Sequence, residues 1–371
     1  MNWREMARVA NTLLAALAAA LLCEWLHTPI PWMLGPLLVT ALASMLGAPT
    51  RSSVLLRNGG QWVIGAVLGL YFTPQVGALV VGLWWAIALA VLWALGMGGL
   101  FGGWLQRQHA GDFAHLPPGA WRATSYFASA IGGASEMTLL AERHGARTDL
   151  VAAAHSVRLV IVVVSLPFAM QWAQSHWGLQ VDARLLPKPG EVHWPGLLVL
   201  GLATAAGGLV MTALKRTNPW FMGALLVSMG LTLADWNGSA VPKNLSDAAQ
   251  LVIGVSLGVR FQREFVHTAP RWLASVASGT VVMMVLSLGF GLALSWATGL
   301  HPATMILGTT PGGIAEMAIT AKVLHLGVPV VTAFQVCRLV AVLVLVGPLF
   351  RWVLGPEKKA DLLVSGLGDK S

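Results

Sequence analysis

The sequence predicts an all-α polytopic membrane protein with about ten spans, arranged as two inverted repeats. Each repeat would contain five transmembrane helices and a glycine-rich re-entrant segment, with both chain termini in the cytoplasm. Hydropathy, an internal duplication and the distribution of Lys and Arg predict this class. Of 371 residues, 56% are hydrophobic and only 10% are charged, and the mean hydropathy is +0.71. Soluble domains carry about 25% charged residues, whereas the apolar runs of 18 or more residues in this chain are typical of membrane spans.

The internal duplication relates the two halves of the chain. Residues 131–164 and 311–344 align without a gap and are identical at twelve of 34 positions. Residues 61–69 also match residues 250–258. Shared apolar composition gives some chance identity, but it does not place glycines, a glutamate and an arginine in register. The sequence therefore predicts two copies of one structural unit.

Each half contains six apolar segments that we expect to be helical. The first run resembles a secretory signal peptide, but its counterpart in the second half cannot be one, so we predict a retained span. The segments are approximately 9–26, 30–47, 58–72, 75–104, 120–141 and 149–173 in the first half, and 194–214, 219–235, 246–261, 271–299, 303–323 and 329–354 in the second.

The distribution of positive charge predicts how these segments cross the membrane. Twelve spans would place 13 Lys and Arg inside and 8 outside, leaving aside Arg158 and Arg338, which lie within spans. If the fifth segment of each half is re-entrant, 17 lie inside and 4 outside. Cytoplasmic loops carry an excess of Lys and Arg, so the inverted arrangement is favoured. The predicted organisation is a first repeat at 1–175, an external linker at 176–193, a second repeat at 194–356 and a cytoplasmic tail at 357–371.

Each re-entrant segment contains the motif GG-x-x-E-M, at residues 132–137 and 312–317. Glycine lets the chain turn or approach another backbone, and irregular backbone is tolerated at membrane depth only where protein or water lines it. Paired glycine-interrupted segments in two halves indicate a transporter's binding site, although glycines also serve close helix packing. The site residues predicted from the motif are Gly132, Gly133 and Glu136, and Gly312, Gly313 and Glu316.

Two arginines lie within predicted spans, near the middle of the bilayer. Arg158 and Arg338 are each the tenth residue of a span, and His155 and Gln335 precede them by three residues, on the same helix face. Buried charges usually mark a pathway or an ion pair. We therefore include all four residues in the predicted substrate site. Gln61 and Gln250, which match across the repeat, either line the same cavity or hydrogen-bond between helices.

Two interpretations of the buried charges stay open. The pairs Glu136–Arg158 and Glu316–Arg338 are structural ion pairs, or the arginines bind an anionic substrate bidentately while a glutamate carries a proton or helps to hold a cation. Because His155 and Gln335 differ, the two half-sites are chemically unequal under either interpretation.

The tandem halves, each with GG-x-x-E-M followed by an apolar helix with R-L-V, resemble the AbrB-type membrane protein family. The resemblance covers nearly the whole chain. It implies membership of a group variously labelled as ammonia monooxygenases, as regulators of gene expression and as transporters. The arrangement of five spans with a glycine-rich re-entrant loop is also similar to the citrate and glutamate symporter type of fold, an analogy of fold only.

The sequence argues against metal and nucleic-acid chemistry. The ten histidines are scattered, without the clustered ligands that copper or iron requires, and no soluble basic module for DNA binding is present. We therefore expect no cofactor, no enzymatic activity and no direct contact with nucleic acid. The predicted function is a multi-pass secondary transporter of the bacterial inner membrane for a small anionic metabolite, with H⁺ or Na⁺ coupling or none. The alternatives are a membrane regulator that acts indirectly on gene expression and a monooxygenase. The expected partners are a small-molecule substrate and lipid, and a homodimer is compatible with the sequence.

Overall fold

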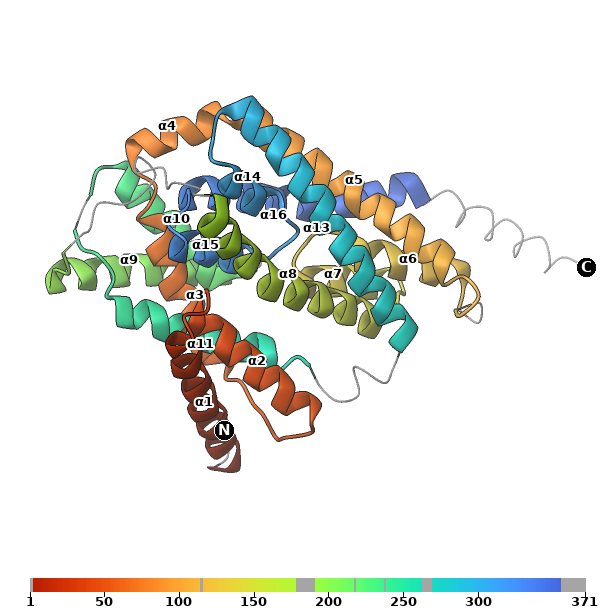
Figure 1. Ribbon diagram of the computed structural model, residues 1–371, viewed down its shortest axis with the longest axis horizontal. Coiled ribbons are helices and arrows are strands. Elements are labelled where there is room, and N and C mark those ends of the chain that lie inside the picture. The colour runs from red at the N-terminus through yellow and green to blue at the C-terminus, as the bar shows by residue number, and fades with distance from the viewer. Residues whose placement is uncertain are drawn as a thin grey trace, which may run out of the picture.

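The structure is a computed structural model that describes residues 3–113, 116–177, 191–216, 218–236, 238–261 and 269–354. The regular elements of these ranges are all helices (Figure 1). The predicted tail and most of the predicted linker lie outside them. The helices of the first half are α1 (Trp3–Trp25), α2 (Pro31–Met45), α3 (Val54–Gly69), α4 (Pro74–Gly82), α5 (Trp84–Gln108), α6 (Pro118–Ser129), α7 (Ala134–Arg143) and α8 (Thr148–Trp177). Those of the second are α9 (Trp194–Ala213), α10 (Pro219–Leu233), α11 (Lys243–Gly258), α13 (Pro270–Thr298), α14 (Pro302–Thr309), α15 (Ile314–Val323) and α16 (Val328–Leu354).

Six described helices are long and apolar enough to cross a membrane: α1, α5, α8, α9, α13 and α16. The consecutive helices α3 and α4 would add a seventh span, although they are bent by 89° with respect to each other. The prediction of an all-α, membrane-type chain is confirmed for this part of the protein. Large apolar side chains such as Leu198, Leu202 and Trp296 are exposed, as expected for surfaces that face lipid.

Two predicted segments differ from the helices that form. The predicted segment 75–104 is two helices, α4 and α5, which meet at Leu83, whereas its counterpart α13 is continuous. The fifth segment of each half is broken into two short helices, α6 and α7 or α14 and α15, separated by residues 130–133 and 310–313. The backbone is therefore irregular at the two glycine motifs, as predicted.

The helices pack in two groups, which we call the panel and the core. The panel contains α1, α2, α3, α9, α10 and α11, and the core contains α5–α8 and α13–α16. In Figure 1, α1, α2 and α11 lie at the lower left, and α5, α6 and α13 at the upper right. Within each group the pairs of packed helices have counterparts across the repeat: α2 with α11 corresponds to α10 with α3, and α8 with α13 corresponds to α16 with α5. In both groups, helices of the first half therefore pack on helices of the second half.

Close backbone contacts explain why glycines recur in the panel. A Cβ atom at Gly65 of α3 would collide with the backbone oxygen of Phe221 in α10. Gly254 of α11 is equivalent to Gly65, and a Cβ atom there would collide with the oxygen of Met33 in α2. Small residues at such crossings let helices approach closely where no hydrophobic driving force between helices is available in lipid.

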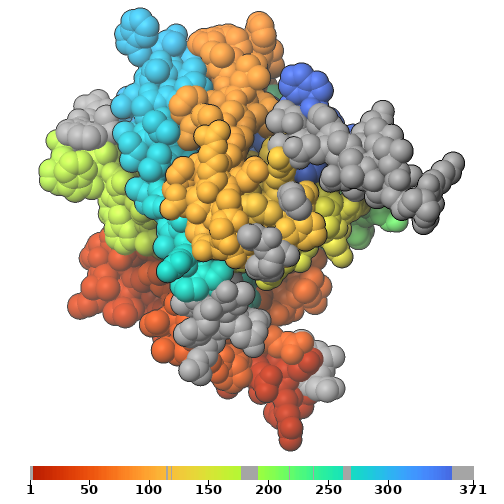
Figure 2. Space-filling view, turned by 90° about the vertical axis from the view of Figure 1, so that its right-hand side faces the viewer, coloured from red at the N-terminus to blue at the C-terminus, as the bar shows by residue number. Residues whose placement is uncertain are grey.

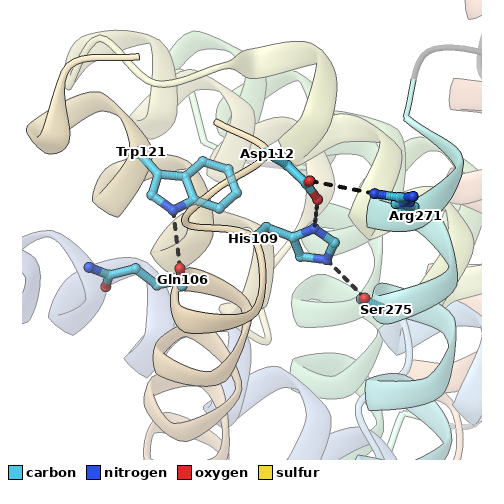
Figure 3. A network of polar contacts seen from close by, with 6 residues as sticks. All are labelled: Gln106, His109, Asp112, Trp121, Arg271 and Ser275. Atoms are coloured by element: carbon cyan, nitrogen blue, oxygen red, sulfur yellow. Dashed lines mark hydrogen bonds and ion pairs between the residues drawn. The ribbon is translucent and has the colours of Figure 1, made fainter. Parts of the chain in front are cut away.

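A polar network joins α5 and α13 at one end of the core (Figure 3). His109, which follows α5 and is buried, lies with Nδ1 2.8 Å from Asp112 Oδ2 and with Nε2 2.8 Å from Ser275 Oγ of α13. Arg271 lies 3.9 Å from the same carboxylate. Figure 2 shows α5 and α13 on one face of the molecule, above α1 and α2. The network attaches the end of the first half's α5 to the start of the second half's α13.

Candidate functional site

A polar cavity of about 150 Å³ lies where the two broken helices of the core meet the panel. Both interruptions, at residues 131–136 and 311–316, contribute to its wall, together with α8 and α16 of the core and α3, α10 and α11 of the panel. The structure thus brings nine of the predicted site residues to one place: Gly132, Gly133, Glu136, His155, Arg158, Gly312, Gly313, Glu316 and Arg338. Gln335 does not line the cavity but supports Arg338 from behind.

Each glycine of the GG-x-x-E-M motif makes room for one later residue of the motif. A Cβ atom at Gly133 would overlap the carboxylate of Glu136, and one at Gly132 would lie only 2.9 Å from the methyl group of Met137. Residues 312–317 repeat both relations. Since Gly133 caps the start of α7, Glu136 lies in the first helical turn, where the helix dipole stabilises a negative charge. The spacing of the motif therefore reflects a carboxylate folded back over the second glycine.

In the first half, Arg158 binds the carbonyl end of the broken helix. Its guanidinium donates to the oxygens of Ser129 and Ala130 at 3.0 and 2.8 Å and to His155 Nδ1 at 2.7 Å. His155 Nε2 lies 2.9 Å from the oxygen of Phe127. Because the oxygen only accepts and the guanidinium only donates, His155 is a neutral imidazole with its proton on Nε2. The side chain is therefore a satisfied buried residue that orients Arg158.

In the second half, Arg338 has the same place but stronger support. It donates to the oxygens of Thr310 and Gly312 at 2.7 and 2.6 Å and to Gln335 Oε1 at 2.6 Å. Gln335 Nε2 in turn donates to carbonyls at the end of α14, at 2.7 Å to Leu307 and 3.2 Å to Thr310. The predicted sharing of a helix face by residues i and i+3 is confirmed in both halves.

The two glutamates are not ion-paired with these arginines. Within the described residues, neither Glu136 with Arg158 nor Glu316 with Arg338 forms a salt bridge within 4.0 Å, so the interpretation as structural ion pairs is wrong for this conformation. The backbone carbonyls, which sequence spacing does not reveal, take the arginine donors instead. Both carboxylates attract Arg260 of the panel. Glu316 is only 7% exposed, whereas Glu136 is half-buried.

The panel contributes polar residues that the sequence did not single out. Arg57, Asn218 and Arg260 line the cavity, and Gln61 does so while its Nε2 lies 3.3 Å from Asn218 Oδ1. Its match, Gln250, is buried outside this lining. The missed signal was positional: Arg57 lies one turn before Gln61, and Arg260 follows shortly after the end of α11. The sequence treats both as loop charges, although Arg57 lies inside α3, which begins four residues before the predicted segment.

The described residues contain no group of three or more His, Cys, Asp and Glu side chains that could hold a metal ion. The charged groups of the cavity wall are four arginines and two glutamates. This set favours a small anion.

Comparison with known proteins identifies the family. The family model described as "Transition state regulatory protein AbrB" matches residues 32–354, which include both glycine motifs and both buried arginines. The chain belongs to the AbrB family. The resemblance inferred from the motifs is confirmed.

Two AbrB family relatives match most of the chain. It is 29% identical over 368 residues to "Uncharacterized protein YhjN" of Bacillus subtilis (strain 168), covering 89% of each chain. It is 25% identical over 328 residues to "Putative regulator AbrB" of Escherichia coli (strain K12), covering 87% of this chain and 89% of the relative.

Proposed function

We propose that this AbrB family protein is a secondary transporter of the bacterial inner membrane that moves a small organic anion by alternating access. The observation that carries the proposal is the cavity at the crossing of two broken helices, between the panel and the core. Interrupted helices at equivalent places in two halves surround the substrate sites of many transporters. The principal helix contacts between panel and core are those of α3 with α15 and α16, and alternating access would require the two groups to move relative to each other there.

The packing of the panel supports the inverted arrangement with ten spans and two re-entrant segments. Gly65 and Gly69 of α3 meet Phe221 and then Ser228 of α10, so α3 and α10 run in the same direction. The symmetry-related pair, α11 and α2, is likewise parallel, because Gly254 and Gly258 meet residues 33–41 in ascending order.

Two contacts indicate that α3 runs in the opposite direction to α2. Ser44 Oγ, near the end of α2, lies 2.5 Å from Thr50 Oγ1, so the chain that leads into α3 is still at the end of α2. A Cβ atom at Gly60 of α3 would lie 3.0 Å from the oxygen of Ala249, near the start of α11. Because α11 runs parallel to α2, Gly60 lies at the level of the start of α2. Helix α3 therefore runs against α2. Since α10 is parallel to α3, the equivalent helices α2 and α10 run in opposite directions, as inverted repeats require.

The donors of the cavity favour an anion, and both the panel and the core can supply them. Arg158 and Arg338 each donate to two backbone carbonyls, and the buried Nε of Arg338 has no hydrogen-bond partner among the described residues. Arg57 of the panel has a buried Nε without a partner in the same part of the chain, and Arg260 lines the cavity together with the two glutamates that attract it. Guanidinium groups in such a position bind carboxylates through paired hydrogen bonds. One of the glutamates, Glu136 or Glu316, would carry the coupling proton or help to hold a cation.

A screen of the purified protein followed by flux measurement tests the proposal. We expect small carboxylates, rather than amines, to raise the melting temperature and to be taken up by proteoliposomes. Arg260→Gln should abolish both effects, while Arg271→Gln, an exposed charge outside the cavity, should leave both unchanged. Carboxylate uptake that survives in Arg260→Gln would contradict the assignment.

The name of the Escherichia coli relative favours a second candidate function. A membrane regulator without transport would respond to a ligand and influence gene expression indirectly. Such a protein should show the shift in melting temperature without flux. The remaining alternative, a monooxygenase, requires about one copper or iron per chain in elemental analysis of the purified protein. We expect neither metal in stoichiometric amount.

A further inference from the structure

The end of α11 that lies away from Arg260 is held to the core by a lysine. Lys322, near the end of α15, donates from Nζ to Ser246 Oγ of α11 at 2.7 Å. The carboxylate of Asp247 attracts the same ammonium group. Ser246 and Asp247 are buried, at 1% and 9% exposed, so this contact closes the boundary between core and panel. Ser246 and Arg260 are about 21 Å apart along the helix axis.

Both partners of this contact have counterparts in the first half. Helices α7 and α15 have equal lengths and occupy equivalent places in the repeat, and Glu142 and Lys322 are each the last residue but one of their helix. Helices α3 and α11 are likewise equal in length, and Arg57 and Ser246 are each the fourth residue. The duplication thus places opposite charges, Glu142 on the core and Arg57 on the panel, where the second half has its closed contact.

The counterparts are apart in this structure. Glu142 is exposed and forms no salt bridge within the described part of the chain. Arg57 lines the cavity, and its buried Nε has no hydrogen-bond partner among the residues that the structure describes. The cavity is lined by Arg57 and not by Ser246, so the free space lies on the side where the equivalent contact is open.

We propose that Glu142 and Arg57 form an ion pair in a second conformation, in which the Lys322–Ser246 contact is broken and the cavity is closed on its present side. The inference rests on the proposed alternating access. Two structurally equivalent halves can exchange conformations, so each contact closed in one state is open in the other. The charges are reversed between the two contacts. In the contact with Ser246 the core supplies a cation, Lys322, whereas in the contact with Arg57 it would supply an anion, Glu142. Each contact replaces the other, so each conformation keeps one of the two boundaries closed.

Cysteine cross-linking of the full chain tests this exchange. In a background without Cys23 and Cys337, we expect the pair Lys322→Cys and Ser246→Cys to react with a short bifunctional thiol reagent in the resting protein. The pair Glu142→Cys and Arg57→Cys should react severalfold faster once Lys322→Ala has broken the other contact. The matched control pairs Arg143→Cys with Arg57→Cys, because the neighbouring position points about 100° away around the helix. Gel filtration confirms that each variant is folded.

Equal rates for the Glu142 and Arg143 pairs in the Lys322→Ala background would overturn the proposal. Spin labels at residues 57 and 142 give an independent reading: a second, shorter distance supports it, and a single long distance overturns it. Neither measurement requires substrate. Cross-linking without flux in proteoliposomes would support the exchange of contacts and contradict the transport function. Flux without cross-linking would support the transport function and contradict the exchange of contacts.

Discussion

In the first half, the backbone oxygen of Ala130 at the end of α6 receives a hydrogen bond from Arg158, whereas in the second half Arg338 and Gln335 both donate to the equivalent oxygen of Thr310. The single N–H of the His155 imidazole donates to the oxygen of Phe127, one turn earlier, so His155 cannot also donate to the oxygen of Ala130. The duplication has preserved the arginines, and one substitution beside them has changed how strongly each broken helix is held. The two half-sites therefore differ in the side-chain donors that hold their broken helices.

The largest expected difference between the halves is in topology. In a background without Cys23 and Cys337, single cysteines at Arg143 and Lys322 should react with an impermeant thiol reagent from opposite sides of the membrane. We expect Arg143→Cys to react from the cytoplasm, because the two short helix pairs enter from opposite sides. Reaction of both from one side would exclude the inverted arrangement.

Removal of the buried arginines should be the next largest effect. Arg158→Ala leaves two carbonyls without a side-chain donor, and we expect it to lower the free energy of unfolding by about 3 kcal/mol. Arg338→Ala should lower it by about 2 kcal/mol, because Gln335 still donates to Thr310. Melting temperatures of the two purified variants check the order. A larger loss for Arg338→Ala would show that the number of donors does not set the strength of these ends.

The motif glycines should respond in the opposite order. A Cβ atom at Gly313 meets the carboxylate of Glu316, which is buried and has little room to move, so Gly313→Ala should destabilise by about 2 kcal/mol. At Gly133 the half-buried Glu136 can swing aside, and the loss should stay near ~1 kcal/mol. Adding Glu316→Ala to Gly313→Ala relieves the collision, and recovery of the melting temperature is the control.

The smallest effect is expected when the first half is made like the second. A glutamine at residue 155 can accept from Arg158 and donate to the oxygen of Phe127, so His155→Gln should change stability by no more than about 0.5 kcal/mol. We expect flux to be retained. Loss of flux at an unchanged melting temperature would show that the imidazole takes part in transport.

The sequence predicts the helical, membrane-type chain, the broken segments and the shared helix faces well, because these depend on local pattern. Residues 132–137 and 312–317 could be predicted as interrupted segments because a glycine pair and a glutamate recur in register in both halves. A glycine pair alone is not sufficient, since Gly98 and Gly99 lie within the continuous helix α5. The partners of Arg158 and Arg338 could not be predicted, since backbone carbonyls carry no residue signature. Arg57 and Arg260 were missed for a related reason: a charge at a helix end reads as a loop charge until tertiary packing turns it toward a cavity.

The exchange of helices between the halves has a consequence for synthesis of the protein. Helix α2 packs on α11, α3 packs on α10, and α5 packs on α16, so the first half alone leaves these surfaces uncovered. When the ribosome has finished α8, the glycine face of α3 and the face of α2 that packs on α11 still lack the partners that the second half supplies. The nascent chain must therefore remain unassembled in the membrane, or be held by an insertase or chaperone, until α10 and α11 arrive. Premature termination in the second half should consequently yield a degraded product rather than a stable half-protein.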